Sequence, residues 1–223
     1  MNQINLKHFG INQFGNDYVV GDIHGMFIEL QQKLDEIGFD EAVDRLFSVG
    51  DLVDRGPNSH LFVKWLAKPW FHAVRGNHEQ MMIDGIRGTS DYPITMWITN
   101  GGKWIMRHSD EAQKLFADIA DKLPLAIEVE TKLGLVGIVH AECPMDDWDL
   151  FKSMYGSNVD RFDNLAMWAR IRIKRKDVSV VQGVHKLYVG HTPLNNVEVL
   201  GNVVYVDTGA CFEGGKFSII KLN

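Results

Sequence analysis

The chain has 223 residues, 45% of them hydrophobic and 23% charged, a composition that allows a sizeable core without support from disulfides or structural metals. Its formal net charge of −6 argues against a protein that coats nucleic acid by bulk electrostatics, so a nucleic-acid partner is not expected. The two cysteines, Cys143 and Cys211, form no CxxC pair and favour a reducing compartment over a disulfide framework.

The sequence contains no signal for a membrane or for secretion. No apolar run approaches the ~18 residues that cross a bilayer, and residues 1–16 lack the basic-then-apolar pattern of a secretory signal. We therefore expect a cytoplasmic protein without a membrane partner. No pattern indicates the oligomeric state, and a monomer is the simplest expectation.

The first half of the chain predicts three units of strand, loop and helix. Each unit begins with a short apolar run followed by a glycine, and each continues with residues of helical periodicity. The predicted strands are 18–20, 46–49 and 71–74, and the predicted helices are 27–37, about 61–66 with Asn58 or Ser59 as N-cap, and about 79–86. Alternating units of this kind are typical of an α/β architecture with a partly parallel sheet.

The second half combines helices with further strands. Residues 94–122 are amphipathic and predict helices, the last beginning at Ser109, with Pro124 closing the stretch. The predicted strands beyond are a hairpin of 125–131 and 135–140, then 187–190, 197–200, 203–207 and 217–222. The poorly periodic segment from about 142 to 186 predicts an excursion over one end of the sheet, so that residues 1–223 form one domain.

Polar side chains follow the three early strands at the point where each strand ends. The loops are 21–25 with Asp22 and His24, 50–57 with Asp51, and 75–79 with Asn77. Two later strands end in His140 and His191. Because ligands of α/β sheets bind outside the carboxyl ends of the strands, these residues are predicted to share one site.

The residue types in these loops indicate a metal centre. Oxygen and nitrogen ligands together fit manganese, iron or zinc, and fit poorly a thiolate site or an all-oxygen calcium cage. A lone strand-end histidine is more often a buried imidazole, and a lone loop aspartate is usually a turn residue. Because five strands are each followed by such a polar residue at one edge, a metal centre is the favoured interpretation. The remaining histidines lack this context and are expected to be structural: His8, His60, His72, His108 and His185.

The loop sequences GDIHG at 21–25, GDLVDRG at 50–56 and RGNHE at 75–79 resemble the signature blocks of the phosphoprotein phosphatase branch of the metallophosphoesterases. The dipeptide His140-Ala141 and residues 190–193 resemble the remaining ligand motifs of that branch. The resemblance covers about residue 18 to the C-terminus and is strongest to the short serine/threonine phosphatases typified by the bacteriophage lambda enzyme.

This resemblance implies a calcineurin-like α/β fold, a four-layer sandwich of two central mixed β-sheets flanked by helices. It also implies two divalent metal ions, with manganese expected and iron or zinc as alternatives. The implied activity is hydrolysis of phosphomonoesters by direct attack of a metal-bridging hydroxide. The implied substrate is a phosphoprotein or phosphopeptide carrying phosphoserine or phosphothreonine, with phosphotyrosine and small aryl phosphates as further substrates.

The resemblance also implies a role for each site residue. One ion is held by Asp22, His24 and Asp51, and the second by Asp51, Asn77, His140 and His191. His78 is the implied general acid and Asp54 the carboxylate that orients it. The implied phosphate-binding arginines are Arg55, Arg75 and Arg170, although an ion pair with Asp54 is an alternative for Arg55. Glu142-Cys143 departs from the family pattern at the rim of the site.

Two other functions fit parts of the sequence. Dinucleoside-polyphosphate hydrolases and RNA-end phosphatases of the same fold share the first block, but the hydrolases typically carry Ala where this chain has Asp54 and Asp where it has Glu79. A non-catalytic phosphate-binding module predicts a degraded ligand set, and no ligand position is degraded. The basic run 170–176 fits a substrate or nucleic-acid patch beyond Arg170, but a solvated, alternating edge strand is the preferred expectation.

Overall fold

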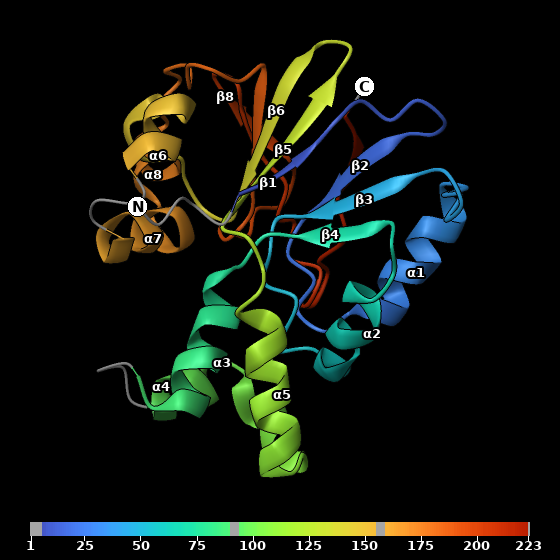
Figure 1. Cartoon of the computed structure of the whole chain (residues 1–223), viewed down its shortest axis with the longest axis vertical. Coiled ribbons are helices and arrows are strands. Elements are labelled where there is room, and N and C mark those ends of the chain that lie inside the picture. The colour runs from blue at the N-terminus through green and yellow to red at the C-terminus, as the bar shows by residue number, and fades with distance from the viewer. Residues whose placement is uncertain (1–5, 90–93, 155–158, 223) are drawn as a thin grey trace.

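The computed structural model describes residues 6–89, 94–154 and 159–222, whose strands form two sheets (Figure 1). The smaller sheet has the order β10-β2-β3-β4. Strands β2, β3 and β4 are parallel, and β10 pairs antiparallel with β2. Their bounds are β2 Asp17–Val20, β3 Arg45–Ser48, β4 Phe71–Ala73 and β10 Ile219–Lys221. The predicted parallel arrangement of the three early strands is therefore confirmed, and their carboxyl ends share one edge.

The larger sheet has the order β1-β5-β6-β7-β9-β8 and mixes parallel with antiparallel pairs. The predicted hairpin is confirmed as β5 and β6, which pair antiparallel from Ala126–Val139 to Thr131–Gly134. Strand β1 was not predicted, because its central residues Lys7 and His8 interrupt the apolar pattern. The bounds are β1 Leu6–Phe9, β5 Ala126–Thr131, β6 Gly134–Val139, β7 Lys186–Val189, β8 Glu198–Leu200 and β9 Val203–Tyr205.

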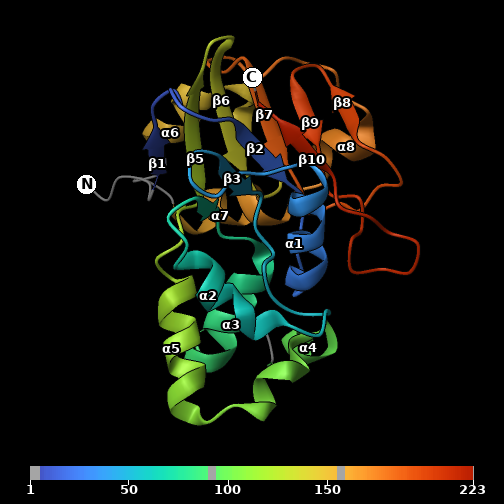
Figure 2. The same cartoon turned by 90° about the vertical axis from the view of Figure 1, so that its right-hand side faces the viewer.

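Helices cover the outer face of each sheet and extend below both (Figures 1 and 2). Helices α1 Phe27–Glu36 and α2 Phe62–Leu66 belong to the smaller sheet, and α6 Trp148–Met154, α7 Val159–Trp168 and α8 Ile171–Arg175 lie beside the larger one. A lower helical group comprises α3 Asn77–Arg87, α4 Ile94–Thr99, a 3₁₀ segment Gly102–Arg107 and α5 Asp110–Ala120. Two short 3₁₀ turns complete the described helical elements, Ser59–Leu61 and Pro144–Asp146.

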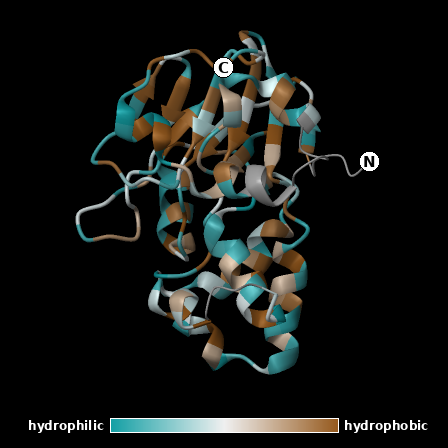
Figure 3. Ribbon diagram, turned by 90° about the vertical axis from the view of Figure 1, so that its left-hand side faces the viewer, coloured by the Kyte–Doolittle hydropathy of each residue, from teal (hydrophilic) through white to brown (hydrophobic). Residues whose placement is uncertain are grey.

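Helices, the two sheets and further helices stack as the expected four-layer sandwich. Three layers of apolar side chains lie between these four. Val19 of β2 faces a layer that contains residues of both sheets, including Ile138 of β6. Its neighbour Val20 faces the opposite layer, which contains Phe27 and Leu30 of α1. Side chains alternate across a strand, so β2 is buried on both faces. The third layer packs the larger sheet against α6 to α8. Figure 3 shows hydrophobic residues concentrated along the strands.

Helix boundaries followed the sequence signals at some termini and not at others. Ser109 is an N-cap as predicted, because its hydroxyl accepts a hydrogen bond from the Ala112 N–H at 3.4 Å. Asn58 makes no side-chain cap hydrogen bond, and a 3₁₀ turn precedes α2 instead. Helix α3 begins at Asn77, two residues before the predicted start, because the Glu79 carboxylate accepts the Gly76 N–H at 2.9 Å.

The excursion at about 142–186 contains the largest departure from expectation. The prediction of an edge strand at 170–176 is wrong, since α8 spans Ile171–Arg175. Arg172 and Ile173 are both buried although they are neighbours in sequence, which the alternation of a strand facing solvent on one side does not allow. Glu142 supports this helix, because its carboxylate accepts the Arg172 N–H at 2.7 Å. Cys143 is buried in the layer beneath it.

Among the described residues, no helix has both the length and the apolar character that a membrane crossing requires.

Candidate metal centre

The six predicted metal ligands come together at one end of the two sheets. All of them are at most 5% exposed: Asp22, His24, Asp51, Asn77, His140 and His191. The strand ends position them, because each follows a strand of the smaller sheet or a parallel pair of the larger one. Burial of this many polar groups is costly without partners, so the site has a strong requirement for neutralising contacts.

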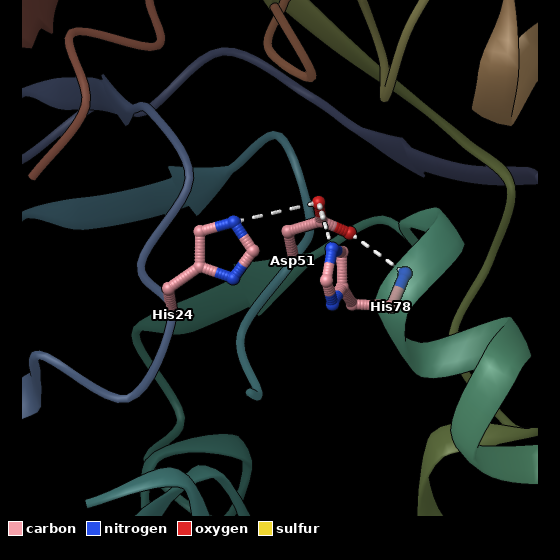
Figure 4. Close-up of side chains that lie close together, drawn as sticks. All are labelled: His24, Asp51 and His78. Atoms are coloured by element: carbon pink, nitrogen blue, oxygen red, sulfur yellow. Dashed lines mark hydrogen bonds and ion pairs between the residues drawn. The ribbon is translucent and has the colours of Figure 1, made fainter. Parts of the chain in front are cut away.

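The Asp51 carboxylate is the centre of the first group (Figure 4). Its Oδ2 lies 3.4 Å from His140 Nε2, 3.7 Å from His24 Nε2 and 3.9 Å from His78 Nε2. These separations exceed those of ordinary hydrogen bonds. His24, Asp51 and His78 form one set of ligand atoms close enough to hold a metal ion, and Asp51, His140 and His191 form another. Asp51 belongs to both sets, as a bridging ligand requires.

The second group brings hydrogen-bond acceptors face to face. His140 Nδ1 donates to the Val49 carbonyl at 2.7 Å, and His191 Nε2 donates to the Trp168 carbonyl at 3.2 Å. In the neutral form that binds metal, the other ring nitrogen of each histidine is therefore an acceptor, and both lie 2.9 Å from Asn77 Oδ1. Three converging acceptors need a cation or a proton among them. The donor set thus fits a metal ion, and the carbonyls orient the rings as metal-binding histidines require.

The pKa values of three ligand histidines respond to burial and to the Asp51 carboxylate. It lowers the pKa of His24 and that of His191 to about 3, so both imidazoles are neutral near pH 7, the form that binds metal. His24 donates from Nδ1 to the Val53 carbonyl at 2.9 Å, which leaves Nε2 as an unprotonated acceptor that faces the Asp51 carboxylate at 3.7 Å. Burial also disfavours charge on His140, but the Asp51 carboxylate outweighs it and raises the pKa of His140.

A second buried carboxylate, Asp207, lies beside Asp22 and was missed by the sequence analysis. Burial, followed by repulsion from Asp207 and Asp51, raises the pKa of Asp22 well above its ordinary value. Burial likewise raises the pKa of Asp207. The clustering of carboxylates in a buried site indicates that positive charge belongs there. Asp207 follows a short apolar run, as the other strand-end residues do, and that signal was present in the sequence.

Five predicted site residues adopt the left-handed backbone conformation that favours glycine: His24, Asp51, Asp54, Arg55 and His191, with φ between 46° and 72°. Such a conformation costs of order 1–3 kcal/mol per residue and persists only where surrounding contacts enforce it. Glu79 enforces it at the Asp51 loop, since its carboxylate accepts the N–H groups of Asp51, Leu52 and Val53 at 2.8–3.2 Å.

His78 and Asp54 form a buried pair next to Asp51. His78 Nδ1 lies 2.7 Å from Asp54 Oδ2, and the exposed fraction of both residues is at most 2%. Two indoles hold Asp54 in turn, Trp97 donating to Oδ2 at 2.9 Å and Trp104 donating to Oδ1 at 2.7 Å. Neither tryptophan was singled out from the sequence, because they lie 43 and 50 residues from Asp54 and match no pattern.

Of the three arginines predicted to bind phosphate, two border the metal centre and one does not. Arg55 donates to His24 Nε2 and lies over the Phe212 ring, so its guanidinium reaches the site. Arg170 also borders the site, donating to the His191 carbonyl at 3.2 Å.

Arg75 is engaged elsewhere. It donates to Gln80 Oε1 at 3.0 Å and forms an ion pair with Asp121 at 3.0 Å, at the end of α5. Its predicted contact with phosphate stays a prediction.

Comparison with known proteins places the chain in a well-populated group. A family model described as calcineurin-like phosphoesterase matches residues 18–213. Serine/threonine-protein phosphatase 1 of Salmonella typhimurium is 38% identical over 92% of this chain and 91% of that protein. Serine/threonine-protein phosphatase 2 of Escherichia coli is 32% identical over 99% of this chain and 97% of that protein.

Two further matches concern dinucleotide hydrolases. A symmetrical bis(5'-nucleosyl)-tetraphosphatase of Coxiella burnetii is 46% identical, but over 71 residues that cover 30% of this chain and 24% of that protein. A crystal structure provisionally assigned as a diadenosine tetraphosphatase superposes with a TM-score of 0.64 at 19% identity, covering 98% of both chains. At that identity the second match concerns the fold alone.

Proposed function

Because the chain belongs to the calcineurin-like phosphoesterase family, we propose that it is a metal-dependent serine/threonine protein phosphatase that acts on phosphomonoesters of phosphoproteins. The observation that carries this proposal is the His78–Asp54 pair, buried against the carboxylate shared by two metal-binding sets. Such a pair supplies a proton donor beside the two metal-binding sets. Relatives of this name match over nearly the whole chain, which supports the same activity.

The metal ligands in this proposal are the six buried residues at the strand ends. One ion would be held by Asp22, His24 and Asp51, since the Asp22 and Asp51 carboxylates lie 4.0 and 3.7 Å from His24 Nε2. The other would be held by Asp51, Asn77, His140 and His191. The mixture of carboxylate, amide and imidazole ligands suits manganese, with iron or zinc as alternatives. When bound, two divalent ions supply positive charge for the phosphate and lower the pKa of a water molecule that serves as nucleophile.

The protein's own groups position the phosphate and protonate the leaving group. Arg55 and Arg170, whose guanidinium groups border the site, offer fork-shaped hydrogen bonds to phosphate oxygens. Arg75 would reach phosphate only after release from Asp121. His78 would donate its proton to the departing serine or threonine oxygen, and Asp54 keeps the ring oriented.

The competing function within the family is hydrolysis of dinucleoside polyphosphates. Asp54 and Glu79, which the dinucleotide hydrolases typically replace, favour a phosphoprotein substrate because both are used in this site. Asp54 is bonded to His78, and Glu79 accepts N–H groups of the Asp51 loop through both carboxylate oxygens. The limited extent of the match to the tetraphosphatase supports the same choice.

The deciding experiment compares turnover of a phosphoserine peptide and of diadenosine tetraphosphate by the manganese-loaded enzyme. We expect the peptide to have the higher kcat/KM. Preference for the dinucleotide would overturn the proposed substrate while leaving the metal centre intact. A chain with no metal-dependent hydrolysis of either compound would instead be a phosphate-binding module.

We further propose that residues 1–223 form one domain with 142–186 as an excursion from it. One layer of the core contains residues of both sheets, which supports this reading. We also propose a cytoplasmic monomer. The two unpaired cysteines, Cys143 and Cys211, are consistent with a reducing compartment, which cell fractionation would test.

A further inference from the structure

A pocket of about 290 Å³ opens beside the candidate metal centre on the excursion. It is lined by Trp168, Arg170, Ile171, Lys174 and Arg175. The pocket adjoins the site through two contacts, because the Trp168 carbonyl accepts from His191 Nε2 and Arg170 Nη2 donates to the His191 carbonyl, each at 3.2 Å. Trp168 ends α7 and Arg170 directly precedes α8, so the pocket lies where the chain passes from one helix to the next, beside the larger sheet in Figure 1.

The cations of this segment divide into paired and unpaired sets. Arg172 is buried and forms an ion pair with Asp146, and Lys176 pairs with Glu198 at 2.7 Å. Among the carboxylates whose side chains the structure describes, those of residues 6–89, 94–153 and 164–222, none pairs with Lys174 or Arg175.

Helical spacing explains this division. Residues three and four apart share one face of a helix, so Ile171, Lys174 and Arg175 lie together in the pocket wall. Arg170 adds a third cation whose described hydrogen bonds go to neutral oxygens, the His191 carbonyl and Thr192 Oγ1. The chain has a net charge of −6, so a pocket with three such cations is a local reversal of charge.

We propose that this pocket binds an acidic group, a carboxylate or a second phosphate, located a few residues from the phosphorylated residue of a peptide substrate. The cations attract the acidic group, while Trp168 and Ile171, 37% and 47% exposed, contact the apolar part of its side chain. The volume suits one side chain and is small for a nucleotide. The proposal rests on the proposed function and gives the enzyme a preference for acidic phosphopeptides.

The test compares phosphoserine peptides that carry Glu, Gln or phosphoserine at one flanking position, scanned along the peptide. With the manganese-loaded wild type, we expect kcat/KM to be about 5- to 10-fold higher for Glu than for Gln at the preferred position. A larger preference for phosphoserine than for Glu identifies phosphate as the natural ligand, and the reverse identifies carboxylate. The preference should fade in ~0.5 M salt, because exposed charges are screened.

The double variant K174A/R175A should lose the preference for Glu and keep the kcat/KM of the Gln peptide. Both side chains are exposed, so the fold should be retained, which thermal unfolding checks. Lys176→Ala is the matched control, since it removes a lysine at the end of the same helix that is already paired with Glu198. The control should keep the full preference.

Three results would overturn the proposal: equal kcat/KM for Glu and Gln peptides in the wild type, an equal loss in Lys176→Ala, or inhibition by RNA that K174A/R175A relieves without any peptide preference. The last result would assign the pocket to nucleic acid. Absence of phosphopeptide turnover together with hydrolysis of diadenosine tetraphosphate would overturn the proposed function itself. Phosphopeptide turnover without acidic preference would overturn only the pocket.

Discussion

The loops after β2, β3 and β4 carry candidate metal ligands, and the outer face of α8 lines the pocket that adjoins the centre through Trp168 and Arg170. The polar side chains of these two regions are held in different ways. In the loops, Asp54 accepts from two indoles and contacts His78, and Glu79 accepts four backbone N–H groups. On α8, Lys174 and Arg175 are exposed.

The difference in how the side chains are held corresponds to two functions, catalysis in the loops and substrate attraction on α8. Groups that exchange protons or bind metal need fixed positions, and the protein fixes them with buried hydrogen bonds and a strained backbone. Groups that attract a charged substrate from solvent act over longer distances and tolerate side-chain motion. Mutations in the loops should therefore affect the chemical step, and mutations on α8 should affect substrate choice.

The largest effect is expected at His78. His78→Asn should lower kcat for a phosphoserine peptide by about 10²–10⁴-fold, because the alkoxide then leaves without a proton. The loss should be smaller, yet still more than a few-fold, for p-nitrophenyl phosphate, whose leaving group needs less protonation. Metal content measured on the purified variant should match the wild type. Loss of metal together with activity would instead make His78 a ligand, as its proximity to His24 and Asp51 allows.

Trp104→Phe tests whether the indoles keep the His78–Asp54 pair in position. The change keeps an aromatic ring but removes the N–H that donates to Asp54 Oδ1 at 2.7 Å, so we expect kcat to fall about 10-fold. KM should stay unchanged, because the indole acts on the proton donor and not on substrate binding. Trp70→Phe, in the core near Phe71, is the matched control and should leave kcat unchanged. A similar fall of kcat in both variants would contradict a positioning role for Trp104.

Arg172→Ala examines the one cation of α8 that resembles the loop residues in being buried. Its guanidinium bonds the Asp177 carbonyl at 3.0 Å and pairs with Asp146, so we expect a loss of about 2 kcal/mol in the free energy of unfolding. Arg175→Ala on the same helix should change it by less than about 0.5 kcal/mol. Urea denaturation measures both. An equal loss in the free energy of unfolding in both variants would contradict the distinction between paired and unpaired cations.

The smallest effect concerns the pH dependence of stability at His72, on the strand that precedes the Asn77 loop. Burial lowers the pKa of His72 to about 3 from 6.5, so the unfolded chain takes up the proton first as pH falls. Stability present above pH 6.5 is therefore lost progressively towards pH 3. His72→Phe should avoid a loss of about 1 kcal/mol between pH 6.5 and 5.5. Parallel stability curves for wild type and variant over this range would exclude the effect.

Most of the sheet framework could be predicted, because apolar runs followed by glycine recur along the chain. Asp22, His24, Asp51 and Asn77 could be grouped for the same reason, because they follow parallel strands that end at one edge of the smaller sheet. His140 and His191 follow the parallel strands β6 and β7 of the larger sheet, and their residue types suggested that they join the same site. Asp207 shows the limit of that reasoning, since it also follows a strand but its proximity to Asp22 depends on how the two sheets pack.

The excursion could not be predicted with the same rules. Alternation of arginine and isoleucine at 170–173 is typical of a strand, yet contacts with Asp146, Asp177 and Glu142 pair the buried Arg172 within a helix. Likewise, Trp97 and Trp104 acquire their role only through tertiary packing around Asp54. Local pattern is informative where secondary structure positions a residue, and uninformative where distant contacts do.

Two glycines constrain how such a centre evolves. A Cβ atom on Gly76 would lie 2.2 Å from Asp51 Oδ1, and one on Gly190 would lie 2.1 Å from Asp22 Oδ1. Every other amino acid carries that atom, so no single substitution at either position is compatible with the placed carboxylates. Gly88, where a Cβ would meet nothing within 4 Å, has only its left-handed φ of 65° to limit it. A side chain at Gly76 or Gly190 would therefore push the Asp51 or Asp22 carboxylate out of the centre, so the absence of an atom at these two positions is as much a part of the centre as its ligands.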